Sequence, residues 1–239
     1  MSRIKGKLLA VGALTLAAFA VAPMAQAEKG DWLFKAGATM VSPKSDNLKL
    51  NDLEVPDLGT LENPIIQVDD GTSLGLTVTY MMTDHWAIEL LAAVPFKHDI
   101  KLDATFEGER GTDKIGDTKH LPPTLSLQYH FMPDGTFNPY IGVGFNTTMF
   151  SGESLTSDAR DLFEALGLTN AKLQLDTSTG VAAQIGVDWY FSDKWFANVD
   201  LRYIDIGTDA KIKADEGNLS LGTVSIDPMV YSLMIGYKF

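Results

Sequence analysis

The feature that most constrains this chain is a two-residue alternation of large apolar side chains with smaller or polar ones, repeated in eight segments. The last segment is the clearest. Counting back from Phe239, alternate positions are apolar, and the positions between them include Lys238, Gly236 and Ser232. Successive side chains of a β-strand point to opposite faces, so such a strand carries one continuous apolar face. This pattern suits a wall with lipid on one side.

Seven earlier segments repeat the same alternation. They span residues 32–41, 74–82, 86–96, 124–131, 141–149, 179–191 and 195–203. One such pattern alone also fits the last strand of a soluble sandwich, but eight together favour a closed wall. Eight is an even number of strands, as a single-chain bacterial barrel requires.

The connections between these segments alternate in length. Short turns follow the second, fourth and sixth segments, and long links follow the odd ones, at residues 42–72, 99–118, 151–174 and 207–222. Short periplasmic turns and long extracellular loops are typical of outer-membrane barrels. All four tryptophans then fall at the periplasmic strand ends, as an interfacial girdle requires. The sequence predicts an all-β fold, an eight-stranded antiparallel transmembrane β-barrel with both termini periplasmic.

The first residues have the pattern of a secretory signal. Arg3, Lys5 and Lys7 precede an apolar run over residues 8–22, and Ala25-Gln26-Ala27 supplies the small residues of a cleavage site. A membrane anchor is the alternative, but the run is shorter than the roughly 20 residues that a spanning helix needs. We expect a cleaved signal peptide over residues 1–27 and one barrel domain over residues 28–239 of the bacterial outer membrane.

Charge and cysteine content exclude several classes of protein. The whole chain has a formal net charge of −12 and no cysteine. An acidic chain is a poor partner for nucleic acid. An exported chain without cysteine is not a disulfide scaffold and has no cysteine-based metal site.

Several motifs resemble those of a known family. "LGLTVTYMMTDHWAIELLAAVPFKHDI", "HLPPTLSLQYHF", "PYIGVGFN" and the final "GYKF" are similar to the OmpW family of small outer-membrane proteins, which includes alkane-uptake relatives. The resemblance runs from about residue 32 to residue 239, and "LPPT" is its most specific element. It implies an eight-stranded barrel with a narrow, largely apolar channel for small hydrophobic molecules, and one member has been proposed to carry small amino acids. The chain departs most from the family in its first and third loops.

Charged side chains on the inward face are the first candidate site. They are Lys35, Glu89, His130, Asp188, Asp200 and Arg202. Charges buried in a narrow lumen must pair or stay hydrated. Two interpretations remain open: a polar network that fills a small barrel, and a plug that closes the lumen base against the periplasm.

Apolar residues of the first and third loops are the second candidate site. Leu53 and Val55 belong to the first loop, and Leu162, Phe163 and Leu166 lie at helical spacing within "SDARDLFEALG". Ser157 or Asp158 would cap this helix and Gly167 would end it. The stripe either packs the helix onto its neighbours or also forms an apolar mouth for hydrophobic cargo.

Three prolines are the third candidate site. Pro95 lies toward the outer end of the third strand, and Pro122 and Pro123 lie toward the outer end of the adjacent fourth. Proline has no N–H to donate to a sheet ladder. The prolines either end their strands at the interface or hold open a lateral gate between them.

From these features we expect passive uptake of small hydrophobic molecules, with lateral exit into the outer leaflet and with no cofactor. Neither a nucleophile elbow nor a histidine–serine pairing accompanies the four histidines, so no catalytic or metal residue is assigned. Expected partners are outer-membrane lipid, the cargo and, through the C-terminal strand, the outer-membrane assembly machinery. A receptor barrel that docks phage or bacteriocin and a narrow channel for small polar solutes such as amino acids remain as alternatives.

Overall fold

The computed structural model describes residues 27–44, 47–55 and 59–239. The predicted signal peptide therefore lies, apart from Ala27, outside the described residues. No helix in this described part is long and apolar enough to cross a membrane.

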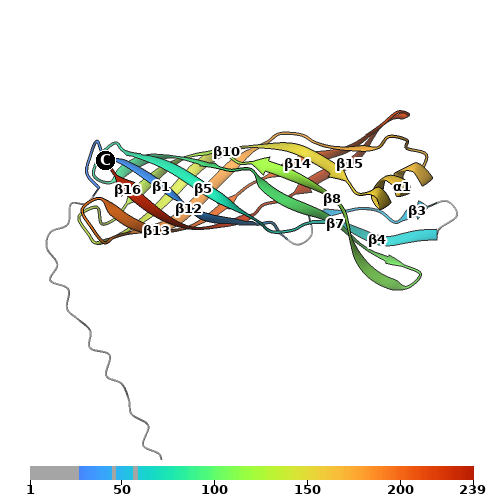
Figure 1. Cartoon of the computed structure of the whole chain (residues 1–239), viewed down its shortest axis with the longest axis horizontal. Coiled ribbons are helices and arrows are strands. Elements are labelled where there is room, and N and C mark those ends of the chain that lie inside the picture. Colours follow the sequence, from blue (N-terminus) through green and yellow to red (C-terminus); the bar gives the residue numbers. More distant parts are fainter. Residues whose placement is uncertain (1–26, 45–46, 56–58) are drawn as a thin grey trace, which may run out of the picture.

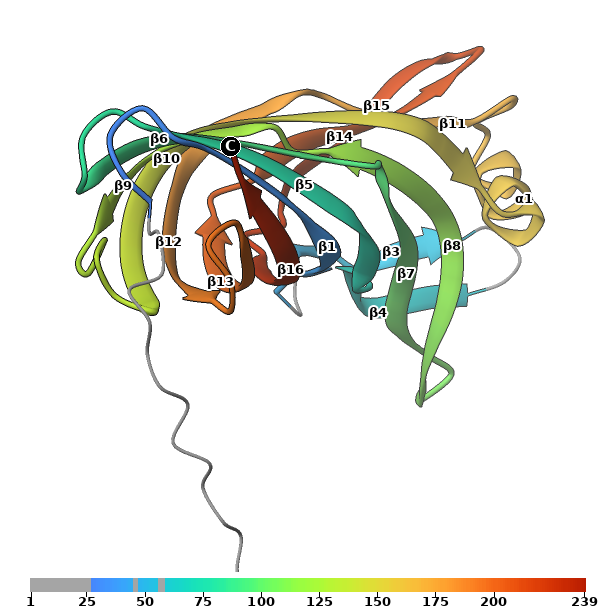
Figure 2. The same ribbon diagram turned by 60° about the vertical axis from the view of Figure 1, so that its left-hand side comes forward.

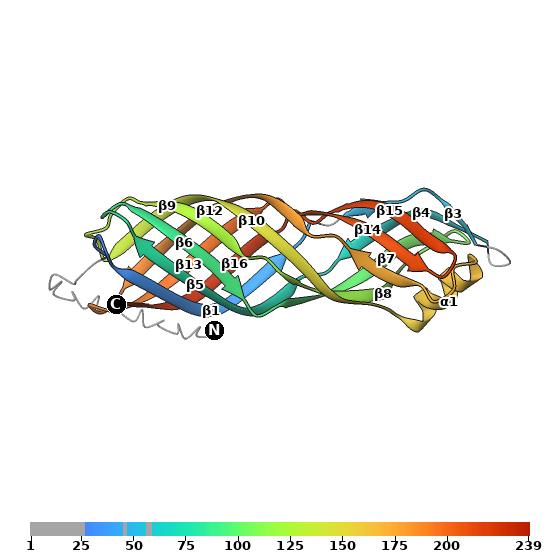
Figure 3. The same cartoon turned by 90° about the horizontal axis from the view of Figure 1, so that it is seen from above.

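Eight antiparallel strands close into a ring, as the alternation predicted. In spatial order they are β1 (Trp32–Ser42), β5 (Gly71–Met81), β6 (Trp86–Ala93), β9 (Thr124–His130), β10 (Phe137–Leu155), β12 (Ser178–Tyr190), β13 (Trp195–Ile204) and β16 (Met229–Lys238). The ring closes because β16 pairs with β1, Leu33 opposite Lys238. Figures 1 and 3 show the resulting elongated barrel, with the C-terminus at one end.

The outer surface of this ring is apolar, as a lipid-facing wall requires. Leu90, Leu125, Val143 and Leu233 are all exposed although they are large and apolar. The tryptophan girdle is confirmed, because each tryptophan lies at the end of its strand and is about half exposed. They are Trp32, Trp86, Trp189 and Trp195.

Above the lipid-facing surface, the wall continues where the sequence predicted loops. The added strands are β2 (Leu48–Lys49), β3 (Leu53–Val55), β4 (Gly59–Val68), β7 (Phe96–Phe106), β8 (Glu109–Leu121), β11 (Lys172–Leu175), β14 (Gly207–Ala214) and β15 (Gly217–Ser225). At about 3.3 Å per residue, the 19 residues of β10 alone extend about 60 Å. The long connections that the sequence predicted are therefore present, and they are built largely from these strands. The exposed side chains there are mostly polar, with Phe106 and Leu219 as exceptions, so the continuous lipid-facing pattern is absent.

The border between these two zones can be located on β6 to β10. Val94 and Met149 are exposed apolar residues, whereas Lys97 and Lys119, the next outward positions on β7 and β8, are exposed and charged. We therefore place β7 and β8 outside the membrane-spanning part of the wall. Figure 2 shows their long hairpin and α1 at the same end of the molecule.

The predicted helix of the third loop forms as α1 (Ser157–Ala165). Its N-cap is Thr156, whose hydroxyl accepts a hydrogen bond from the Ala159 N–H at 3.2 Å. The expectation of Ser157 or Asp158 as the cap was wrong, by one residue or two, because Thr156 is the cap. Gly167 ends the helix as predicted, because its φ of 81° is in the left-handed region that favours glycine.

Candidate functional site

A charged network fills the lumen in the membrane-spanning half of the barrel. Glu89 on β6 lies between two cations, with one carboxylate oxygen 2.6 Å from Lys35 Nζ and the other 2.7 Å from an Arg202 nitrogen. Arg202 Nε also lies 3.5 Å from Asp200. All four side chains are buried. Each charge therefore has an opposite partner, which offsets part of the cost of removing it from water.

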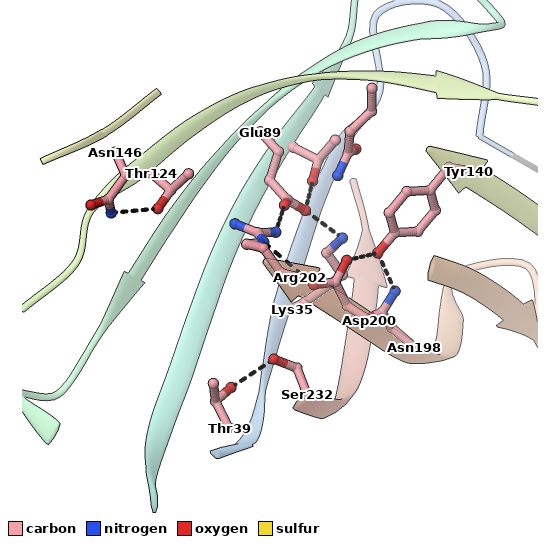
Figure 4. Close-up of polar contacts among 12 residues, drawn as sticks. Lys35, Thr39, Glu89, Thr124, Tyr140, Asn146, Asn198, Asp200, Arg202 and Ser232 are labelled. Carbon is pink, nitrogen blue, oxygen red and sulfur yellow. Dashed lines mark hydrogen bonds and ion pairs between the residues drawn. The ribbon is translucent and has the colours of Figure 1, made fainter. Parts of the chain in front are cut away.

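Neutral groups extend this network around the lumen. Tyr140 donates its hydroxyl to Asp200 at 2.9 Å, and Asn198 donates to Tyr140 at 3.0 Å (Figure 4). Asn198 also donates to Asp188 at 2.8 Å. Sequence reasoning missed Tyr140 and Asn198. The alternation itself contained the signal, since Ile141 and Val199 point outward and their neighbours must point inward.

His130 belongs to the same layer but bonds separately. Its Nδ1 lies 2.9 Å from the Asn138 amide nitrogen, and its Nε2 lies 3.3 Å from Gln128. Of the six predicted residues of the lumen base, five therefore connect through Glu89, Tyr140 and Asn198. The sixth, His130, lies beside them.

An apolar cavity of about 360 Å³ lies above this network, inside the extended wall. Its lining includes Leu53 and, on or next to α1, Leu162, Phe163 and Leu166. Four of the five predicted mouth residues thus come together from two distant loops. Val55 ends β3, with its backbone opposite Gly59. Packed apolar residues such as Val41, Ile206 and Val230 separate the cavity from the polar layer.

Two stacked histidines line the lower part of the cavity. The rings of His98 and His120 lie 4.7 Å apart, and Phe96 stacks on His120 at 5.3 Å. His98 Nδ1 lies 2.6 Å from the Asp69 carbonyl oxygen, to which it donates. Burial lowers the pKa of both rings, to about 3 for His120. Both are therefore neutral at neutral pH and compatible with an apolar lining.

The three prolines lie at a break in the wall. Pro95 separates β6 from β7, and Pro122 and Pro123 separate β8 from β9. The predicted single strand over residues 86–96 is therefore two strands. Among the described residues, backbone pairing stops at Leu91 opposite Thr124 and resumes at Phe96 opposite His120. Residues 92–95 and residues 121–123 lie beside each other here without pairing with each other, and we call this stretch the ladder gap.

Backbone groups beside the ladder gap form hydrogen bonds with other strands or within their own segment, and not across the gap. The Pro123 carbonyl accepts from the Thr147 N–H of β10 at 3.1 Å, and Pro122 accepts from the Thr124 hydroxyl at 3.1 Å. On the other side, the Val94 N–H donates to Leu74 of β5 at 3.0 Å. These bonds satisfy groups that would otherwise face hydrocarbon, where each unsatisfied group costs several kcal/mol.

Comparison with known proteins agrees with this architecture. The model of the OmpW family matches residues 28–239. The chain belongs to the OmpW family. Outer membrane protein W of Vibrio cholerae serotype O1 is 39% identical over 230 residues, which cover 95% of this chain and 97% of that protein. The protein is thus an outer-membrane barrel, as the sequence predicted.

Two further relatives are informative. The crystal structure of the outer membrane protein OprG from Pseudomonas aeruginosa matches with a TM-score of 0.73 and 34% identity, over 90% of this chain and 99% of that one. The dibenzothiophene metabolism operon protein PahQ of Pseudomonas aeruginosa is 25% identical over 224 residues, which cover 92% of this chain and 94% of that protein. The first is an outer membrane protein, and the second is named as a protein of a dibenzothiophene metabolism operon.

Proposed function

We propose that this OmpW-family barrel takes up small hydrophobic molecules passively and releases them sideways into the outer leaflet. The observation that carries the proposal is the position of the ladder gap beside the floor of the apolar cavity. His98 and His120 line that cavity, and the gap begins one residue from Phe96 and His120. Cargo leaving there enters hydrocarbon without crossing water.

The polar layer supports a lateral rather than an axial exit. Beneath the cavity, the lumen holds Lys35, Glu89 and Arg202 in short ion pairs. A hydrophobic molecule that passed axially would have to separate these buried charges and leave them unpaired, which is costly. We therefore assign Pro95, Pro122 and Pro123 as a lateral gate, and the six charged residues as the lumen base plug.

The names of relatives support this class of cargo. One of them is named for dibenzothiophene metabolism, and dibenzothiophene is a flat, apolar molecule. The apolar lining of the cavity fits molecules of this class better than it fits small polar solutes such as amino acids. A receptor role for the extracellular loops is compatible with the same fold but explains neither the cavity nor the gap.

The gate is tested by restoring the missing donors. A triple variant, Pro95→Ala with Pro122→Ala and Pro123→Ala, lets the two strands pair across the ladder gap, because alanine supplies an N–H at each position. We expect slower uptake of a fluorescent fatty-acid probe in proteoliposomes and no change in amino-acid flux. Pro139→Ala is the matched control, since Pro139 lies within the paired part of β10, opposite Val187. Wild-type uptake by a correctly folded triple variant contradicts lateral exit.

A further inference from the structure

Two lysines face each other on the outer surface just above the ladder gap. Lys97 of β7 is the register partner of Lys119 of β8. The neighbouring side chains of Phe96, His98 and His120 are buried inside the wall, so both lysine side chains point outward, where they are exposed. Directly opposed residues have Cβ atoms about 4.5–5.5 Å apart, and like charges in this position destabilise a sheet. Strand pairing alone gives no reason for this arrangement.

The height of this lysine pair matches the headgroups of the outer leaflet. Val94 and Met149 below it face lipid. Met149 is the register partner of Leu121, and Lys119 lies two residues before Leu121 on the same strand. The lysine pair is thus the first charged position above the hydrocarbon on this part of the wall. Lysine and arginine side chains near a membrane surface attract anionic headgroups.

Nearby acidic groups do not cancel the charge of the lysine pair. Asp99 and Asp117 oppose each other one step higher, and Lys114 Nζ lies 2.7 Å from Asp99 and 3.6 Å from Asp117. Lys97 reaches Asp117 only at 3.7 Å. Within the described part of the chain, no carboxylate lies within ion-pair distance of Lys119. Lys97 and Lys114 therefore share two aspartates while Lys119 has none within this distance, which leaves one positive charge in excess here on an acidic protein.

We propose that Lys97 and Lys119 together bind a phosphate group of an outer-leaflet lipid and seat that lipid over the ladder gap. A phosphate offers several acceptor oxygens to two ammonium groups, and charge-assisted hydrogen bonds of this kind are the strong ones. Its negative charge also offsets the repulsion between the lysines. The site extends the proposed function, because the acyl chains of the seated lipid are the hydrocarbon into which cargo leaves.

The chain contains a matched control for this site. Lys172 of β11 and Lys213 of β14 are also register partners and are also exposed. They lie near the extracellular end of the β14–β15 hairpin, beyond the reach of lipid headgroups. This second pair has the same chemistry and the same cross-strand geometry, so it isolates the effect of position.

The experiment measures the affinity of the full-length protein in detergent for diphosphoryl lipid A, by native mass spectrometry. We expect the double variant Lys97→Gln/Lys119→Gln to bind lipid A at least about tenfold more weakly than wild type, because it loses the charge-assisted hydrogen bonds. Lys172→Gln with Lys213→Gln should bind like wild type. Lipid A without its phosphates should bind wild type and the first variant equally.

Several results would overturn the proposal. Equal affinity of wild type and Lys97→Gln/Lys119→Gln for lipid A excludes the site, and an equal loss in the control pair assigns binding to overall charge. Displacement of lipid A by an excess of inorganic phosphate assigns the site to free phosphate instead of lipid. Heat-modifiable gel mobility verifies that each variant is folded. The assay contains no cargo, so its outcome does not depend on whether the proline variants slow uptake.

Discussion

At the scale of single residues, the two stacked histidines link the cavity to pH. His98 donates from Nδ1 to Asp69, and its ring packs beside Gly71, where an added Cβ would lie 2.6 Å from His98 Cε1. A charged ring at either position would lie in an apolar lining against its neighbour. Burial therefore keeps the pKa of His98 and His120 below the usual value of 6.5.

This depressed pKa predicts acid sensitivity of the extracellular half. Below about pH 6.5, these two histidines are protonated in the unfolded chain but stay neutral in the folded protein. The free energy of unfolding therefore falls as pH falls. Between about pH 7.5 and pH 5, we expect wild type to lose about 2 kcal/mol more stability than His98→Asn/His120→Asn. Urea unfolding in detergent measures it. His85→Asn, in an exposed turn, is the control, and identical slopes for wild type and the double variant contradict the prediction.

At the scale of elements, α1 depends on a cap that the sequence alone did not identify. Thr156, Ser157 and Asp158 are all good N-cap residues, and their order in the chain does not choose among them. The choice is made by β10, which ends at Leu155 and places Thr156 at the turn into the helix. The Thr156 N–H also donates to the Ile115 carbonyl of β8 at 2.9 Å, which ties the helix start to the wall.

This geometry predicts different effects for neighbouring hydroxyl residues. Thr156→Ala should weaken α1 by about 1 kcal/mol, because the Ala159 N–H loses its acceptor. Ser157→Ala should have little effect, since its hydroxyl bonds only the exposed Asp158 at 3.1 Å among the described side chains. Hydrogen exchange of residues 157–165 measures the difference. Equal protection in the two variants means that Thr156 is not the effective cap.

At the scale of the whole molecule, the barrel is divided into three layers. An apolar cavity, a packed apolar layer and a polar network follow one another from the extracellular end toward the periplasm. The polar layer opposes the passage of ions toward the periplasm by filling the lumen with paired charges, whereas hydrophobic cargo on the proposed route leaves before reaching it. We therefore expect ion flow and hydrophobic uptake to respond to different residues.

Opening the polar layer tests this division. Lys35→Ser with Glu89→Ser removes one opposite-charge pair and leaves Arg202 beside Asp200. We expect higher single-channel conductance in planar bilayers and nearly unchanged hydrophobic uptake. Lys211→Ser with Asp176→Ser removes a solvent-accessible ion pair of 2.6 Å in the extracellular part of the wall and should change neither. If uptake collapses while conductance stays constant, the network lies on the transport path or is needed for folding.

Much of this molecule could be predicted from the sequence because lipid imposes a simple rule on strands. Wherever the outer face meets hydrocarbon, alternate residues must be apolar, and all eight ring strands were found in this way. Above the membrane the rule no longer holds. In β14, Ala210 and Ile212 point inward while Lys211 and Lys213 point outward, so the pattern is that of an ordinary water-facing sheet.

The candidate site could likewise be predicted only in part. The alternation identified the inward charges but not their partners, because the pairing of Glu89 with both Lys35 and Arg202 depends on the register of strands that are distant in the chain. The prolines could be identified directly in the sequence, whereas the ladder gap could be located only from the residue pairing between β6 and β9. The stacking of His98 on His120 could not be predicted, because it depends on the register between the two strands of the β7–β8 hairpin.

The size of the cavity has a kinetic consequence. A volume of about 360 Å³ is near the lower end for small-molecule pockets, so it accommodates one drug-sized molecule or less. A carrier with one such compartment cannot admit a second molecule until the first has left. Its flux must therefore reach a plateau as the external concentration rises, whereas direct partitioning into the bilayer rises in proportion. Half-saturation then reports occupancy of a single compartment, and two similar hydrophobic molecules must compete for entry.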